Sequence, residues 1–329
     1  TYIKVMNAAG DILIKRNLPN NFTVFKSTIN KFLPDLVVGA ESTYSYYWLY
    51  DGCREAGIPF YLGHGFYMKA ISGNKKKSDP IDAETIAHLL RSNFFPMAYP
   101  YPKEMRATRD LLRRRHRLVR IRAESYTHVH IICHQEGCTD ITSQDLKDKT
   151  ARRELISRFS DRSLQQTIRA DLDMIDMLTP FINQLELEIR NQAKSHNHRD
   201  YALLQTTPGI GEMTALIILY ETHDIKRFPT VQKYSSYCRV IRCERESNGK
   251  MKGNKNQKIG NPYLKWAYGQ ILHNARRCNE CIDRHYQKLE SKHGPVRARS
   301  IMGHKFAVAV YSMLKHNQAF DEQRFIQNN

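Results

Sequence analysis

The sequence of 329 residues contains no uninterrupted apolar run of about 18 residues, the length that a membrane-spanning helix needs. Its first residues also lack the basic, apolar and small-residue sections of a signal peptide. Seven cysteines, an odd number with no secretion signal, indicate a reducing compartment. We therefore expect a cytoplasmic protein with no membrane partner.

The cysteines and histidines do not form a complete zinc motif. Zinc sites of four ligands have two paired halves, and neither cluster here has a matching second half. Both clusters also fall in segments with a helical pattern, so we do not expect zinc, although the sequence leaves the question open. The two clusters are Cys278, Cys281 and His285, and Cys133 and Cys138 near His128, His130 and His134.

Acidic residues are too few to balance the basic ones. Asp and Glu number 33 against 51 Lys and Arg, which gives a formal net charge of +18. A strongly basic chain without an amphipathic membrane helix is typical of a nucleic-acid-binding protein. A solvated basic surface is the alternative interpretation.

Residues 1–100 have an α/β pattern. The runs TYIKVM and DILIKR, joined by NAAG, predict a β-hairpin, and PDLVVGAE predicts a strand that ends at Glu41. A helical segment that stops near Gly57 follows, and PFYLG then predicts another strand. This alternation of strand, helix and strand predicts a parallel pair.

Residues 101–196 predict an elongated helical arm. The segment EMRATRDLLRRRHRLVRIRAE is rich in arginine, and we expect part of this set, including Arg113, Arg114 and Arg117, to contact nucleic-acid backbone. Apolar residues recur every three or four positions from Leu164 to Ile189, as in a coiled coil. Pro180 is expected to kink this second helix.

Residues 197–329 predict a third, mostly helical domain. LLQTTPGIGEMTALIILYE has the form of a helix-hairpin-helix, whose Gly209 and Gly211 turn would bring backbone N–H groups to a phosphate. A turn between two packed helices would have the same sequence pattern. A polar, basic loop over 245–262 follows, and then two helices near 262–291 and 296–315 are expected.

The stretch KKKSDPIDAETIAHLLR allows two interpretations. Asp79 would cap a helix, with Pro80 in its first turn and Asp82 favouring the helix dipole. Alternatively, Asp79 and Asp82 share one side of that turn and, with Glu41 at a strand end, offer hard oxygen ligands for Mg²⁺. Lys75, Lys76 and Lys77 would then attract a phosphate backbone.

Several motifs together resemble one known family. GAESTYSYYWL, KKKSDPIDAETIAHLLR, LLQTTPGIGEMTA, and RESNGKMKG followed by KIGNPYLKWA occur in the order seen in DEDD transposases of bacterial insertion-sequence family 110, which includes the Piv-type DNA invertases. The resemblance runs from about residue 37 to 315. It implies a RuvC-like (RNase H-like) N-terminal domain over 1–100, a coiled-coil arm over 101–196 and a C-terminal transposase domain over 197–329.

The resemblance also implies site residues and partners. Glu41, Asp79 and Asp82 match three of the four acids that bind Mg²⁺, in a site of two ions, and Ser247 matches a serine that attacks a DNA phosphodiester and becomes covalently linked to it. The neighbouring Arg245, Lys250 and Lys252 would stabilise the charged phosphate. Members act on donor and target DNA as oligomers with sites composed from different subunits, many guided by a bridge RNA, so we expect a nucleoid-associated bacterial protein.

The sequence departs from the family at its first acid. No Asp precedes TYIKVMNAAG, which matches the second strand of the family, and Asp11 falls at the tip of the expected hairpin. We expect the missing strand and its acid to lie just upstream of Thr1.

Two alternatives to a transposase or recombinase remain open from the sequence. One is a RuvC-like nuclease that hydrolyses DNA without a covalent intermediate, and the other is an inactive relative that binds nucleic acid. Insertion and inversion are equally compatible with the residues.

Overall fold

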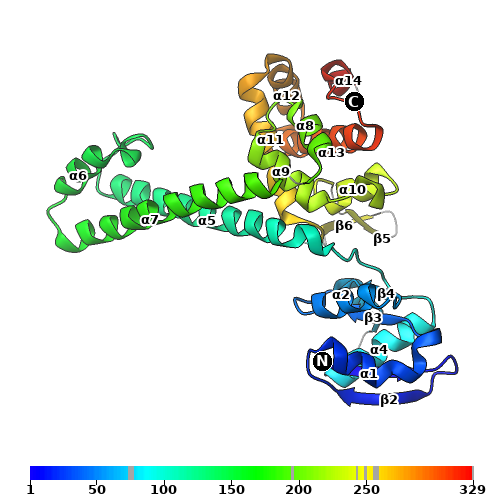
Figure 1. Ribbon diagram of the computed structural model, residues 1–329. Coiled ribbons are helices and arrows are strands. Elements are labelled where there is room, and N and C mark those ends of the chain that lie inside the picture. Colours follow the sequence, from blue (N-terminus) through cyan, green and yellow to red (C-terminus); the bar gives the residue numbers. More distant parts are fainter. Residues whose placement is uncertain (73–77, 194–195, 242–243, 248–249, 255–258, 328–329) are drawn as a thin grey trace. The chain divides into compact units, whose positions relative to one another are not determined.

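The chain is mostly helical and divides into two compact units, Thr1–Glu104 and Met105–Asn329 (Figure 1). The computed structural model describes residues 1–329 except 73–77, 194–195, 242–243, 248–249, 255–258 and 328–329. Over 69–72, 244–247 and 250–254 it describes the backbone alone.

In its described residues, the first unit combines four strands with short helices. Its elements are β1 (Tyr2–Met6), β2 (Ile12–Asn17), α1 (Phe22–Ile29), η1 (Asn30–Asp35), β3 (Val38–Glu41), α2 (Tyr47–Glu55), β4 (Phe60–Gly63), α3 (Gly65–Ser72) and α4 (Asp79–Arg91).

The strands form two pairs, as the sequence pattern predicts. β1 and β2 are antiparallel, and the Asn7 side chain closes their turn by accepting hydrogen bonds from the backbone N–H groups of Gly10 and Asp11. β3 and β4 are parallel, with Glu41 opposite Gly63 at their carboxyl ends. The hairpin and the parallel pair are therefore confirmed, and Asp11 lies in the hairpin turn.

Helix α4 contacts both pairs of strands. Gly39 of β3 lets the helix approach closely, since a Cβ added there would lie 2.5 Å from Cδ1 of Leu90. On the other side, Glu84 of α4 forms an ion pair with Lys4 of β1, whose side chain is largely buried. Because both contacts fix α4, they also fix where its first turn lies relative to the end of β3.

The second unit contains the arm and a helical domain. Its elements are α5 (Lys103–Gln135), η2 (Asp145–Lys147), α6 (Lys149–Ser157), α7 (Arg162–Ala193), α8 (His198–Gln205), α9 (Glu212–Thr222), η3 (Ile225–Arg227), α10 (Val231–Tyr237), β5 (Glu244–Ser247), β6 (Lys250–Asn254), α11 (Pro262–Cys278), α12 (Glu280–His293), α13 (Pro295–His316) and α14 (Glu322–Gln327).

Helices α5 and α7 lie side by side and form the arm, with α6 at its far end (Figure 1). The buried residues of α7 follow the predicted stripe: Ile168, Leu172, Ile175, Leu178, Ile182 and Ile189. Spacings of three, four and seven keep these side chains on one face, as in a heptad repeat. Helix α7 continues through Pro180.

Helix α9 is the centre of the C-terminal core. Every residue from Thr214 to Thr222 is buried, and the apolar ones belong to a cluster that also includes Tyr268 and Phe306. The sequence predicted one helix over 262–291, but the structure has two. Asn279 adopts an extended backbone, which ends α11, and its side chain accepts a hydrogen bond from Ile282 N–H, which begins α12. None of the helices in the described ranges is long and apolar enough to span a bilayer.

Candidate active site and nucleic-acid interface

Glu41 lies at the carboxyl end of β3, as predicted, where its carboxylate packs over the start of α3. A Cβ added to Gly65 would lie 2.3 Å from Glu41 Oε1, so only glycine leaves room for the carboxylate. The side chain is half-buried. Its position depends on the parallel pairing of β3 with β4, which brings Gly63 and then Gly65 beside it.

Asp79 and Asp82 both lie in the first turn of α4, but the helix begins one residue earlier than the sequence suggested. Ser78, with an extended backbone, is the N-cap, and Asp79 is already helical. Asp79 therefore is not the cap, and the start of the helix does not depend on a hydrogen bond from its carboxylate. Both carboxylates still favour the positive end of the helix dipole.

The three acids line one cavity of about 590 Å³. Glu41 reaches it from the end of β3, and Asp79 and Asp82 reach it from α4, with Thr43 and Ser45 also in the lining. Among the described residues, no three His, Cys, Asp or Glu side chains are arranged closely enough to hold a metal ion. The carboxylate oxygens of Glu41, Asp79 and Asp82 are of the chemical type that Mg²⁺ prefers. The three side chains therefore share a cavity but are not close enough together to form a metal site.

The same cavity separates β1 from β3. Residues of both strands line it, and within the described parts of the chain no strand pairs with either facing edge. The three lysines predicted to attract phosphate, Lys75, Lys76 and Lys77, precede α4 and lie outside the described residues.

Ser247 is the last residue of β5 and lies opposite Lys250 in a short antiparallel hairpin. Arg245 belongs to β5 and Lys252 to β6, so the backbone places all four predicted residues on this hairpin. Their side chains lie outside the described part of the structure.

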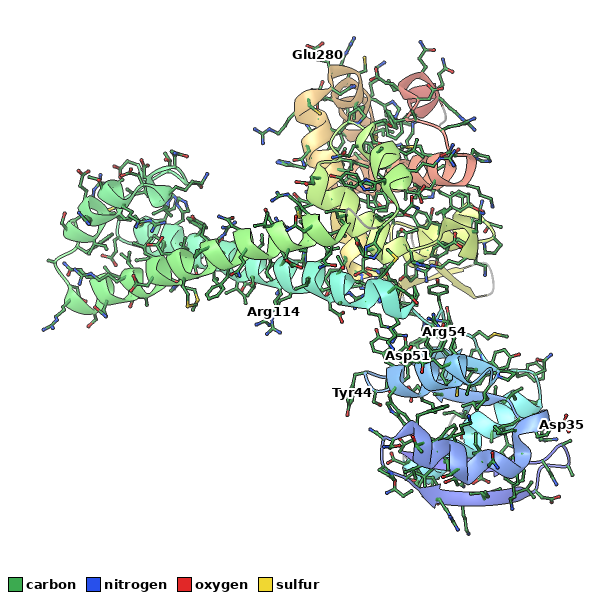
Figure 2. All side chains as sticks on the ribbon, viewed as in Figure 1. Asp35, Tyr44, Asp51, Arg54, Arg114 and Glu280 are labelled. Carbon is green, nitrogen blue, oxygen red and sulfur yellow. The ribbon has the colours of Figure 1, made fainter. Side chains whose placement is uncertain are left out.

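The arginines of α5 separate into two groups. Arg114 and Arg117 are exposed, and in the described ranges of the chain neither has an ionic or hydrogen-bonded partner; Figure 2 shows Arg114 projecting from the arm. Arg115 pairs with Glu186, at 2.6 Å. Arg113 pairs with Glu221. The structure thus gives Arg113 an internal partner and leaves Arg114 and Arg117 available to a phosphate backbone.

Gly209 and Gly211 have different surroundings in the turn between α8 and α9. Gly209 has φ +85°, and a Cβ there would lie 2.4 Å from the carbonyl oxygen of Ile271 in α11. Gly211 caps α9 with φ −82°, and among the described residues, its two chain neighbours aside, no atom lies within 4 Å of a Cβ position. Close packing against α11 therefore accounts for Gly209, whereas Gly211 is open to solvent.

Replacing Gly209 with alanine should destabilise the protein by about 2–5 kcal/mol, because a left-handed backbone and overpacking add their costs. The matched change Gly211→Ala should cost less than about 1 kcal/mol, since it affects only the cap preference. Chemical denaturation of both variants measures the difference. Equal costs would contradict the assignment of Gly209 to helix packing.

Two sequence models of one transposase family match the chain. Residues 2–133 match the DEDD transposase domain of IS110-type elements, and residues 201–287 match the transposase of the IS116/IS110/IS902 family. The chain belongs to the IS110 family of transposases. As an IS110-family transposase it is an enzyme that recombines DNA. No curated protein matches the sequence.

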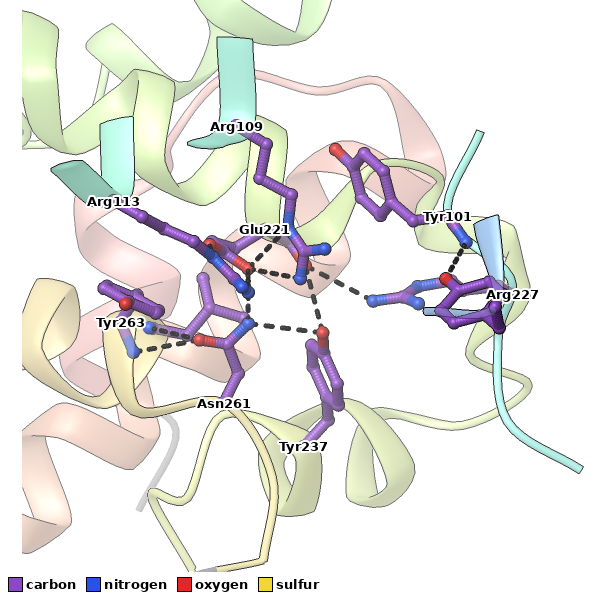
Figure 3. Close-up of polar contacts among 10 residues, drawn as sticks. Tyr101, Arg109, Arg113, Glu221, Arg227, Tyr237, Asn261 and Tyr263 are labelled. Atoms are coloured by element: carbon purple, nitrogen blue, oxygen red, sulfur yellow. Dashed lines mark hydrogen bonds and ion pairs between the residues drawn. The ribbon is translucent and has the colours of Figure 1, made fainter. Parts of the chain in front are cut away.

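One group of polar residues in this transposase was not predicted from sequence. Glu221 of α9 is 2% exposed and accepts hydrogen bonds from Arg109, Arg113 and Asn261 (Figure 3). The sequence does contain one indication of a buried carboxylate, because Glu221 ends the otherwise apolar run ALIILYE. A buried carboxylate needs charged or hydrogen-bonded partners, and the partners here come from distant parts of the chain.

Proposed function

We propose that this transposase cuts and rejoins DNA through a Mg²⁺-dependent carboxylate site, formed by Glu41, Asp79 and Asp82, and a nucleophilic serine, Ser247. The observation that carries the proposal is the convergence of the three acids on one cavity from two separate elements. Such convergence at the carboxyl end of a parallel strand pair favours a site over simple helix capping.

In the proposed reaction, Oγ of Ser247 attacks a phosphorus atom of DNA. A Ser Oγ–phosphorus bond forms, the bond from phosphorus to one deoxyribose oxygen breaks, and that oxygen takes up a proton. A hydroxyl group of another strand then attacks the phosphoserine and releases the serine, so each phosphodiester bond broken is replaced by a new one. Cations on the same hairpin, Arg245, Lys250 and Lys252, favour the added negative charge on phosphorus.

The carboxylates would hold Mg²⁺, which when bound supplies Lewis-acid stabilisation of the charge on the phosphate oxygens. Glu41 is held in place by its packing over Gly65. The positions of Asp79 and Asp82 depend on α4, which packs against Gly39 of β3 and forms an ion pair with Lys4 of β1. The fourth acid implied by the family resemblance stays a prediction.

The nucleic-acid partners follow from the same proposal. DNA is the substrate, and exposed Arg114 and Arg117 on the arm offer contacts that do not depend on sequence. We propose that a bridge RNA supplies sequence recognition and that a homo-oligomer brings the carboxylate site of one subunit to the serine hairpin of another. Sequencing the RNA that co-purifies with the protein tests the guide directly.

The catalytic proposal can be tested by cleavage of labelled DNA that spans the flanks of the gene encoding this protein. With Mg²⁺ and any co-purified RNA present, the full-length protein should produce labelled DNA that migrates with protein on a denaturing gel and is released by protease digestion. Chelation of the metal with EDTA should suppress this product. Cleavage that yields only free DNA ends would support the nuclease alternative, and binding without cleavage would support the inactive relative.

A further inference from the structure

Glu221 links the arm to the C-terminal core through hydrogen bonds from two arginines and one asparagine. Arg109 donates to Glu221 Oε2 from Nε at 3.0 Å and Nη2 at 2.8 Å, and Arg113 donates from Nε to Oε1 at 2.6 Å. Asn261 Nδ2 donates to Oε2 at 2.7 Å. Burial alone would raise the pKa of Glu221, but pairing with Arg113 and Arg109 outweighs it and lowers the pKa. The carboxylate is therefore ionised at neutral pH.

The hydrogen bonds between Glu221 and its partners form a network. On one side of it, Asn261 connects the two ends of the segment that carries β5 and β6. Asn261 N–H donates to the carbonyl oxygen of Tyr237 at 2.6 Å, and its Nδ2 donates to the Tyr237 hydroxyl at 3.2 Å. One step further along, Arg239 Nε donates to the carbonyl oxygen of Ile259 at 3.1 Å. Residues on either side of the hairpin are thus joined at its base.

Gly260 makes the closure of this base tight. With φ +99° it adopts a backbone conformation that favours glycine, and a Cβ there would lie 2.6 Å from the carbonyl oxygen of Tyr237. Asn261 then begins α11 by accepting hydrogen bonds from Tyr263 N–H and Leu264 N–H. One asparagine therefore caps a helix, closes the hairpin base and contacts Glu221.

The arginine side of the network belongs to the arm. Arg109 and Arg113 are one helical turn apart on α5, and the next turn presents the exposed Arg114 and Arg117. Figure 3 shows the two guanidinium groups and Asn261 meeting at Glu221 from opposite sides. The helix that offers cations to nucleic acid is therefore connected to the hairpin base through one carboxylate.

We infer that Glu221 is a positioning residue that fixes the Ser247 hairpin relative to arm helix α5, through Arg109 and Arg113 on one side and Asn261 on the other. The inference rests on the proposed role of Ser247. Glu221 acts through its partners and contacts no DNA. A displacement of about 1 Å at a reacting group lowers rates on the order of 100-fold, so fixing the hairpin base matters for attack on phosphorus.

Glu221→Gln tests the network with a side chain of the same shape. The variant should bind DNA with unchanged affinity but form the protein–DNA adduct on the order of 100-fold more slowly. Backbone amides of β5 and β6 should exchange hydrogen faster, on the order of tenfold, as expected for loss of a hydrogen bond to a charged group.

A second pair of variants keeps the test decisive if Glu221→Gln does not fold. Asn261 and Asn279 each cap a helix of the same domain and each donate from Nδ2 to a glutamate, Glu221 at 2.7 Å and Glu322 at 2.5 Å. Asn261→Ala should slow adduct formation and speed exchange in β5 and β6, whereas Asn279→Ala should change neither. Equal effects of the two variants, or no effect of Asn261→Ala on exchange, would overturn the inference.

The exchange measurement separates this inference from the proposed chemistry. If Ser247→Ala still forms the adduct, the serine mechanism is wrong, and exchange in β5 and β6 still reports whether Glu221 positions the hairpin. If Ser247→Ala abolishes the adduct but exchange is unchanged by Asn261→Ala, the mechanism stands and the positioning role fails.

Discussion

Replacing Ser247 with alanine should abolish the covalent protein–DNA adduct, with a loss of at least about 10³-fold in its rate of formation. The reason is chemical, because alanine has no oxygen that can bond to phosphorus. DNA binding should persist, since the basic residues on the hairpin and the arm are unchanged. Labelled DNA on a denaturing gel measures the adduct, and a filter-binding assay measures affinity for DNA.

Ser291→Ala provides the control for this change. Ser291 is an exposed helical serine of the same unit whose hydroxyl donates to the carbonyl oxygen of Lys288 in its own helix. This variant should form the adduct at the normal rate. Continued cleavage by Ser247→Ala, with free DNA ends as the product, would instead identify a hydrolytic nuclease.

Replacing each cavity carboxylate with its amide should lower DNA cleavage on the order of 10³-fold while leaving DNA affinity intact. The variants are Glu41→Gln, Asp79→Asn and Asp82→Asn. An amide keeps the shape of the side chain but removes the negative charge that holds a hard cation, and the metal contributes several kcal/mol to stabilisation of the transition state. The rate of cleavage at saturating DNA and the affinity for Mn²⁺ measure the two expected losses.

Glu55→Gln is the matched control for the carboxylates. Glu55 belongs to the same unit but does not line the cavity, and its exposed carboxylate makes an ion pair with Lys103 at 3.5 Å. Exposed ion pairs contribute about 0–1 kcal/mol, so this variant should cleave DNA normally. Strand exchange at the normal rate by Glu41→Gln and Asp79→Asn would show that the cavity is not the metal site.

Elements with a simple periodic pattern could be predicted from the sequence. A continuous apolar run that ends at Glu41 fixed the place of β3, and the spacing of Ile168, Leu172 and Ile175 predicted the buried face of α7. Both depend on neighbours in sequence, which a continuous apolar run and a heptad pattern record directly. The expected meeting of Glu41 with Asp79 and Asp82 came from the rule that sites form beyond parallel strand ends, and all three line one cavity.

The partners of individual side chains could not be predicted in this way. Arg113 and Arg114 are neighbours in an arginine-rich run, yet one pairs with a buried carboxylate and the other is exposed. The difference depends on Glu221, which is 108 residues from Arg113 along the chain. For the same reason the sequence could not separate a phosphate-binding Gly209 from a closely packed one, because Ile271 lies in another helix.

Identification of the residue that becomes linked to DNA provides a direct test of the proposed serine chemistry. The full-length protein would be incubated with Mg²⁺, its co-purified RNA and DNA from the flanks of its gene, and then denatured. Nuclease and protease digestion would leave a peptide that carries a nucleotide, and mass spectrometry would locate the modified residue. We expect a nucleotide on Ser247. DNA that is cut with no modified peptide, or a nucleotide on a different residue, would contradict it.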